Sequence, residues 1–119
     1  MKLKNVEQLH FSYAYTYFIT ISSRYQFIKA REVYRLVYRF LNNHDINAKI
    51  RSVKEFTKKT KEEHFHILYF TNKKLEYKKL HNYLKKHNLQ HYDINIQIVR
   101  KTIDDIKNVK KYMLKFKVS

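Results

Sequence analysis

The stretch His64-Phe65-His66-Ile67-Leu68-Tyr69-Phe70 predicts the centre of the fold. Its run of aliphatic and aromatic residues is typical of a strand buried in a sheet. Residues 49–57 predict a second strand, and the polar residues 58–63 between the two strands favour a hairpin. Because residues two apart on a strand face the same side, the imidazoles of His64 and His66 are expected to stand together.

Strands and helices alternate on both sides of this hairpin. Residues 13–22 predict a central strand, and residues 30–41 predict a helix whose apolar residues recur at helical spacing. After the hairpin, the patterns predict a helix at 74–87, a half-buried strand at 93–100 and a helix at 102–116. The order βαββαβ, followed by a last helix, predicts an α+β fold with an antiparallel sheet of the ferredoxin-like or RRM-like type. Residues 1–119 are expected to form one domain.

The composition predicts a nucleic-acid partner. The chain of 119 residues has a formal net charge of +16, which favours a polyanionic partner, although a ribosome-associated protein or a merely basic one is an alternative. The hydrophobic fraction of 44% excludes a disordered chain. No segment has the length of a membrane span or the pattern of a signal peptide, and cysteine is absent. We therefore expect a cytoplasmic protein (in the host cytoplasm if viral) with no membrane partner.

Tyr112 and Lys115 lie one helical turn apart on the last predicted helix, which places a nucleophile beside a positive charge. Tyr83 and Lys86 have the same spacing, and about two such matches are expected by chance. A His-x-His pair is less common, since 7 histidines give about 0.4 pairs by chance. The order and context of the motifs therefore matter more than each motif alone. The other histidines, including His10, are expected in loops or at exposed helix positions.

Three motifs occur in a characteristic order: Phe18-Ile19-Thr20, the histidine pair, and Val109-Lys110-Lys111-Tyr112-Met113-Leu114-Lys115. In this order the chain resembles the HUH superfamily of single-tyrosine Rep endonucleases, which initiate replication in plasmids and small viruses. The resemblance covers nearly the whole chain and is strongest to the compact Rep proteins of archaeal rod-shaped viruses. Ile21-Ser22 departs from the first motif, where a proline often follows.

The resemblance implies a metal-dependent, sequence-specific enzyme that nicks and joins single-stranded DNA through a 5′-phosphotyrosine intermediate. On this interpretation His64, His66 and Glu55 bind Mn²⁺ or Mg²⁺, which suit imidazole and carboxylate ligands. Glu55 falls about opposite His66 if the hairpin turn centres near residues 60 and 61. Glu62 and Glu63, which directly precede His64, are the alternative carboxylates.

The implied nucleophile is Tyr112, with Lys115 steadying the phosphate or the phenolate, and the last helix is the element that carries it. Tyr83 is the rival, although it directly follows the histidine strand, whereas the family places its nucleophile after a further strand. The expected partner is single-stranded DNA at a replication origin or genome terminus. The expected DNA contacts are Thr20 of the first motif and a basic helix stripe: Arg31, Arg35 and Arg39.

Two other functions and an assembly state remain open. A single-tyrosine transposase of the same superfamily is disfavoured because those enzymes typically carry a glutamine where this chain has Lys115. A non-catalytic RRM-like nucleic-acid-binding domain would need exposed aromatics on the central strands, for which Tyr15, Tyr17, Phe65 and Tyr69 are candidates. A homodimer is expected, because pairing two copies would cover one edge of each sheet.

Overall fold

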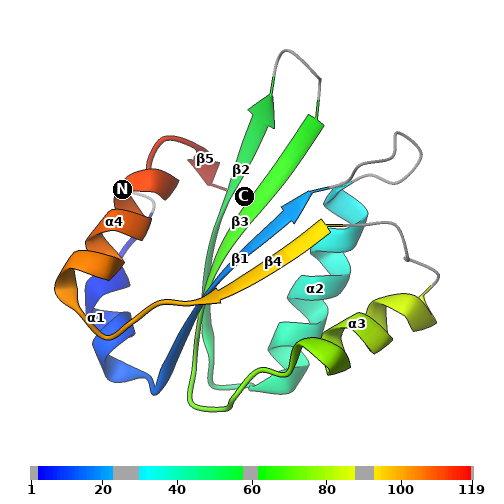
Figure 1. The fold of residues 1–119 in the computed structure, drawn as a ribbon, viewed down its shortest axis with the longest axis horizontal. Helices are drawn as coiled ribbons and strands as arrows, with labels where there is room; N and C mark the ends of the chain where they lie inside the picture. Colours follow the sequence, from blue (N-terminus) through cyan, green and yellow to red (C-terminus); the bar gives the residue numbers. More distant parts are fainter. Residues whose placement is uncertain (1–2, 23–29, 58–61, 88–92, 119) are drawn as a thin grey trace.

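An antiparallel sheet with helices on both faces forms the fold of the computed structural model, which describes residues 3–22, 30–57, 62–87 and 93–118 (Figure 1). The elements in chain order are α1 (Val6–Ser12), β1 (Tyr15–Ser22), α2 (Ala30–His44), β2 (Lys49–Thr57), β3 (Glu62–Thr71), α3 (Tyr77–Lys86), β4 (Asp93–Ile98), α4 (Ile103–Met113) and β5 (Lys117–Val118). The predicted α+β class is confirmed. Within the described residues, no helix is long and apolar enough to cross a membrane.

The strands lie in the order β4-β1-β3-β2-β5, and every neighbouring pair is antiparallel. β3 is the middle strand, between β1 and β2, and is buried from Phe65 to Thr71. Its apolar run is continuous rather than alternating because helices cover both faces of the sheet at this strand. The predicted hairpin residues 58–61, including the expected turn centre, lie outside the described residues.

Successive side chains along the strands point to opposite faces of the sheet and pack into two separate hydrophobic cores. Ile19 and Ile67 pack beneath α2 and α3, whereas Leu68 and Phe70 pack beneath α1 and α4. Figure 1 shows these two helical layers on opposite sides of the sheet. The side of the sheet to which a side chain points therefore decides which residues can form a common site.

Two elements and one helix end differ from the sequence-based expectation. The short helix α1 and the two-residue strand β5 were not predicted. Asn5, which precedes α1, has a φ of 62° and is therefore in the left-handed conformation. Glycine usually occupies such positions, but the chain contains no glycine, and asparagine is one of the few other residues that tolerate this conformation. α4 begins after its Thr102 cap as expected, but it ends at Met113 rather than at residue 116. The expectation that Lys115 lies on the helix is therefore wrong.

Candidate functional site

His66 lies at the centre of a set of contacts that joins three strands. Its Nδ1 is 3.1 Å from the hydroxyl oxygen of Thr20 on β1, and its Nε2 is 2.9 Å from Oε1 of Glu55 on β2. Because the carboxylate accepts, Nε2–H donates to Glu55, and the Thr20 hydroxyl is the hydrogen-bond partner of Nδ1. Thr20, expected at the DNA, therefore orients the imidazole in this structure.

The register of the hairpin differs from the expected one. Glu55 lies opposite His64, and Val53 lies opposite His66, so the prediction that Glu55 faces His66 directly is wrong. The Glu55 carboxylate nevertheless reaches His66 along the diagonal between neighbouring strands. Such diagonal neighbours are within reach of a long side chain.

Aromatic rings surround the imidazole of His66. Phe18 and Phe116 are nearly parallel to it, with ring centroids 5.7 Å and 5.2 Å away. Tyr112 meets it edge-on, with a centroid separation of 5.3 Å. His66 is only 3% exposed as a result. This packing and the two hydrogen bonds hold the ring in one orientation.

His64 and the two alternative carboxylates, Glu62 and Glu63, do not all lie on the same face of the sheet. Glu62 lies on the same face of β3 as His64, and its Oε2 is 3.4 Å from the Nε2 of His64. Glu63 points to the opposite face, where it pairs with Arg31 at 3.2 Å and with Lys54 at 3.1 Å. Burial raises the pKa of Glu63, but the hydrogen bond from Lys54 and the nearby charge of Arg31 outweigh it, so the net pKa is lowered. Glu63 is thereby removed from the candidate ligands.

The donor set suits a divalent ion, although the side chains form pairs rather than one cluster. Among the described residues, no three His, Cys, Asp or Glu side chains converge on one point. The Nε2 of His66 and the Oε1 of Glu55 are 2.9 Å apart. Adjacent ligands of an octahedral ion with bonds of about 2.1 Å are separated by about 3 Å. The His66–Glu55 pair has this spacing, and the chemistry of imidazole and carboxylate is compatible with Mn²⁺. His64 and Glu62 lie on the same face of the hairpin as a separate pair.

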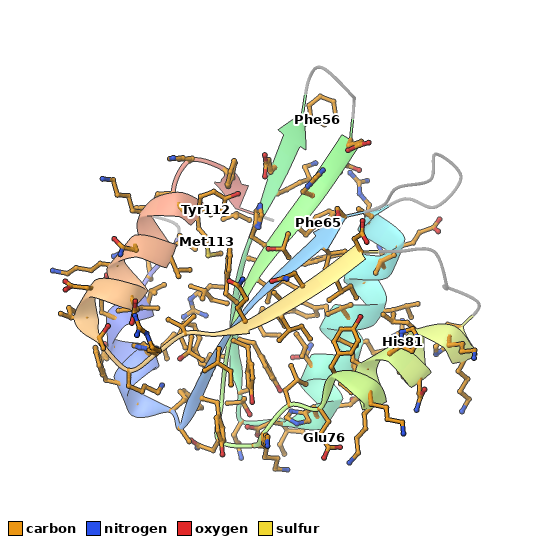
Figure 2. The ribbon with its side chains drawn as sticks, viewed as in Figure 1. Phe56, Phe65, Glu76, His81, Tyr112 and Met113 are labelled. Carbon is orange, nitrogen blue, oxygen red and sulfur yellow. The ribbon has the colours of Figure 1, made fainter. Side chains whose placement is uncertain are left out.

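Tyr112 is the tyrosine that the structure brings to this site, through its ring contact with His66. Figure 2 shows Tyr112 beside Met113 at the end of α4. The neighbouring Met113 is buried and anchors the end of α4, whereas Tyr112 is 40% exposed. Burial raises the pKa of the Tyr112 phenol, and the negative charge of Glu55 raises it further. Lys115 lies past the helix, with its Nζ 5.8 Å from the centroid of the Tyr112 ring, so it faces the ring. The rival Tyr83 is on α3, in the other helical layer, where it packs against Phe40.

The expected arginine stripe is not near these residues. Arg31, Arg35 and Arg39 are exposed on α2, which covers the opposite face of the sheet from Tyr112 (Figure 1). The structure thus brings together Glu55, His66 and Tyr112, with Thr20 behind the imidazole and His64 beside it on the same face. It does not bring the three arginines to this group.

Phe116 and α1 are parts of the site that the sequence patterns do not indicate. Phe116 fits the apolar stripe of the last predicted helix, which gives no sign that its ring covers His66. On α1, Glu7 binds Lys110, with its Oε1 2.9 Å from the Lys110 Nζ, and this hydrogen bond lowers the pKa of Glu7. The ion pair ties α1 to the turn of α4 that precedes Tyr112.

His10 is buried, contrary to the expectation of a loop or an exposed position. Its Nδ1 is 2.7 Å from the Thr16 hydroxyl oxygen, and its Nε2 is 2.8 Å from the carbonyl oxygen of Arg100. Lys101 donates to the Thr16 hydroxyl at 3.2 Å and to the carbonyl of His10. This network links α1, β1 and the segment that leads into α4, so both ends of α4 are tied to the rest of the fold.

Comparisons with known proteins identify relatives along nearly the whole chain. The model of a viral family, described as "Virus, 117-like", matches residues 12–116. "Uncharacterized protein 117" of Sulfolobus islandicus rod-shaped virus 1 is 49% identical over 115 residues, which cover 97% of this chain and 95% of that protein. The crystal structure of the hypothetical protein ORF119 from the same virus is also similar, with a TM-score of 0.76 and 46% identity. That match covers 98% of this chain and 94% of the crystallised one.

These matches correct the family expected from the sequence motifs. The matching model is that of a different family, and neither relative's name refers to a Rep endonuclease. The assignment to the HUH superfamily is therefore wrong. The chain belongs to the viral family described as "Virus, 117-like".

Proposed function

We propose that this chain is a metal-dependent enzyme that nicks and rejoins single-stranded DNA, with Tyr112 as its nucleophile. One observation carries the proposal: Tyr112 of α4 meets the ring of His66, whose Nε2 is hydrogen-bonded to Glu55. A nucleophile beside an imidazole–carboxylate pair that suits a divalent ion is an arrangement for phosphoryl transfer. The formal net charge of +16 supports a nucleic acid as the substrate.

His66 and Glu55, with His64 on the same face, would hold Mn²⁺ or Mg²⁺. When bound, such an ion polarises a phosphate oxygen and offsets the charge that develops in the transition state. With the ion on Nε2, that nitrogen would carry no proton, and Nδ1–H of His66 would donate to the Thr20 hydroxyl, which lies 3.1 Å away. Glu62 is the second carboxylate of this face, through its contact with His64.

In the nicking step, the Tyr112 phenol oxygen forms a bond to phosphorus and the bond from phosphorus to the 3′ oxygen breaks. The phenol proton passes to solvent, and the departing 3′ oxygen takes a proton to become a free hydroxyl. The 5′ end remains on Tyr112 as a phosphodiester, so no water is consumed and the reverse reaction rejoins the strand. Lys115, whose ammonium lies over the Tyr112 ring, would steady the phosphate.

The biological role that we propose is the initiation of viral DNA replication, at an origin or a genome terminus and in the host cytoplasm. Membership of a viral family supports this role. In this proposal the sheet is a scaffold of the ferredoxin-like type, and α4 is the helix that carries the nucleophile. The 3′ hydroxyl left by the nick would prime synthesis.

The burial of aromatic residues argues against the non-catalytic RRM-like alternative. That function requires rings exposed on the central strands to stack on bases. Tyr17 and Phe65 are each 3% exposed, and Tyr69 is fully buried, because α2 and α3 cover that face of the sheet. Only Tyr15 of the four candidates is partly exposed.

The proposal is tested with a library of end-labelled, randomised single-stranded oligonucleotides, since the nick site is unknown. The protein is incubated with the library and Mn²⁺ or Mg²⁺, and the products are separated on a denaturing gel. We expect shortened DNA, and its loss when a chelator is added. Cleavage that persists in excess chelator would contradict the metal-dependent mechanism, and no cleavage with either ion would contradict the proposed activity.

A further inference from the structure

The two helical layers differ in charge. α1 and α4 carry as many acidic as basic residues, with Glu7, Asp104 and Asp105 balancing Lys107, Lys110 and Lys111. On the other face, α2 presents Arg31, Arg35 and Arg39 with one acidic residue, Glu32. α3 adds Lys78, Lys79, Lys85 and Lys86 and no acidic residue. The positive charge of the helices is therefore concentrated on the face opposite Tyr112.

These cations are available to a partner. All seven of the arginines and lysines on α2 and α3 are exposed. Arg31 contacts Glu63, and Lys79 contacts Glu76, but the arginine and lysine side chains of these pairs are 53% and 73% exposed. Exposed ion pairs of this kind contribute little and exchange readily for a phosphate. We call the exposed cations of the two helices the α2–α3 surface.

The α2–α3 surface carries two neighbouring groups of cations, one on each helix. Arg31, Arg35 and Arg39 recur every four residues and span about 12 Å along α2. α3 packs against α2 through Tyr83 and Phe40, whose ring centroids are 5.3 Å apart. Packed helix axes lie about 8–10 Å apart, so the two groups of cations are near enough to contact one polyanion together.

The aromatic residues of this layer favour a duplex over a single strand. Proteins that bind single strands place free aromatic rings among their cations so that bases can stack on them. The exposed rings here are packed against their own helices, Tyr38 on Tyr34 and Tyr77 on His81, with centroid separations of 5.9 Å and 6.2 Å. Tyr38 and Tyr77 are partly exposed, but each already contacts a neighbouring ring, so the surface offers mainly cations, which contact phosphates.

We propose that the α2–α3 surface binds the phosphate backbone of duplex DNA, while the Tyr112 face remains accessible to a single strand. This proposal depends on the proposed function in one respect: the nicking of DNA is the reason for choosing duplex DNA over duplex RNA as the partner. A duplex on one face and a single strand on the other would let the protein hold the double-stranded DNA that flanks a nick site. The arginine stripe, which the structure places away from Tyr112, thereby has a separate partner.

The test is a fluorescence-anisotropy titration of a labelled blunt-ended DNA duplex at several salt concentrations. Two double variants remove charge from the α2–α3 surface: Arg35→Gln/Arg39→Gln and Lys78→Gln/Lys86→Gln. The matched control, Lys107→Gln/Lys111→Gln, removes the same charge from α4. All are made in the Tyr112→Phe background and measured without metal, so the result is independent of nicking. Thermal unfolding confirms that each variant is folded.

We expect each α2 or α3 double variant to weaken duplex binding about 10-fold or more, and the control to weaken it much less. The slope of log K against log salt should fall by about 0.9 for each phosphate that a variant no longer neutralises. Equal weakening in the control would show that only bulk charge matters and would overturn the proposal. It would also be overturned if the variants were impaired only in single-strand binding, or if the wild-type surface bound duplex RNA more tightly than duplex DNA. If the protein does not nick DNA but the double variants weaken duplex binding as expected, the proposed function is rejected and the proposed duplex-binding surface is retained.

Discussion

Glu55 Oε1 lies 2.9 Å from His66 Nε2, although the strand register places Glu55 opposite His64. The carboxylate therefore crosses the hairpin on the diagonal and meets the imidazole on the face where Tyr112 packs. This relationship places Glu55, His66 and Tyr112, the proposed metal ligands and the proposed nucleophile, within one group, although they come from β2, β3 and α4.

The three candidate carboxylates should differ in their effect on metal binding. We expect Glu55→Gln to weaken Mn²⁺ binding about 10-fold or more, because it removes a charged ligand beside His66. Glu62→Gln should have a smaller effect, and Glu63→Gln, on the opposite face, should have none. Titration calorimetry with Mn²⁺ measures all three. A larger effect at Glu63 than at Glu55 would show that the metal is bound elsewhere.

Thr20 should act by orienting His66. In Thr20→Val the hydroxyl that bonds to Nδ1 is removed while the shape of the side chain is kept, so we expect Mn²⁺ affinity to fall by about 10–100-fold, as for other partners of metal ligands. Thr20→Ser retains the hydroxyl and should restore most of the affinity. Thermal unfolding checks that both variants are folded. Equal affinities in Thr20→Val and wild type would rule out this positioning role.

The buried His10 should make the stability of the fold depend on pH. Burial lowers the pKa of His10 and the charge of Lys101 adds to this, outweighing the Arg100 carbonyl and Asp105, which raise it. In the unfolded chain the imidazole takes up a proton near pH 6.5, so the folded state loses stability as the pH falls below that value. Urea unfolding should show this loss between pH 7 and pH 5. His10→Gln should be less stable at pH 7 but lack this pH-dependent loss, and an identical pH dependence in both proteins would contradict the assignment.

The protein should form a homodimer. β4 is an outer strand of the described sheet, and its Ile98 is 64% exposed, so pairing with a second copy would cover an open edge. Light scattering at micromolar concentration should give about twice the chain mass of 14.8 kDa. Ile98→Lys should shift the mass towards the monomer. A wild-type monomer that still cleaves and rejoins DNA would show that the dimer is not required.

Local patterns predicted the long elements of the fold well. The bounds of β2 match residues 49–57, and the Thr102 cap marks the start of α4, because side-chain alternation and a capping hydroxyl are local signals. α1 was missed because seven residues are too few to show a helical period. In the fold, Val6 and Leu9 of α1 pack in the core that also holds Leu68 of β3 and Ile106 of α4.

Local sequence patterns do not predict the parts of the site that depend on contacts between segments far apart in the chain. The pairing of Glu55 with His64 depends on the length of the hairpin turn, which composition does not fix. Phe116 fits the apolar spacing of a continued helix, but the chain turns after Met113, and the Phe116 ring covers His66. The sequence alone could not show that Arg31 and Tyr112 lie on opposite faces of the sheet.

The covalent adduct tests the central claim most directly. Wild-type protein, Tyr112→Phe and the matched control Tyr83→Phe are incubated with labelled single-stranded DNA and Mn²⁺, and the adducts that survive denaturation are digested and mapped by mass spectrometry. We predict an adduct on Tyr112 in the wild type and in Tyr83→Phe, and none in Tyr112→Phe, which lacks only the attacking oxygen. An adduct mapped to Tyr83, or one that persists in Tyr112→Phe, would contradict the account.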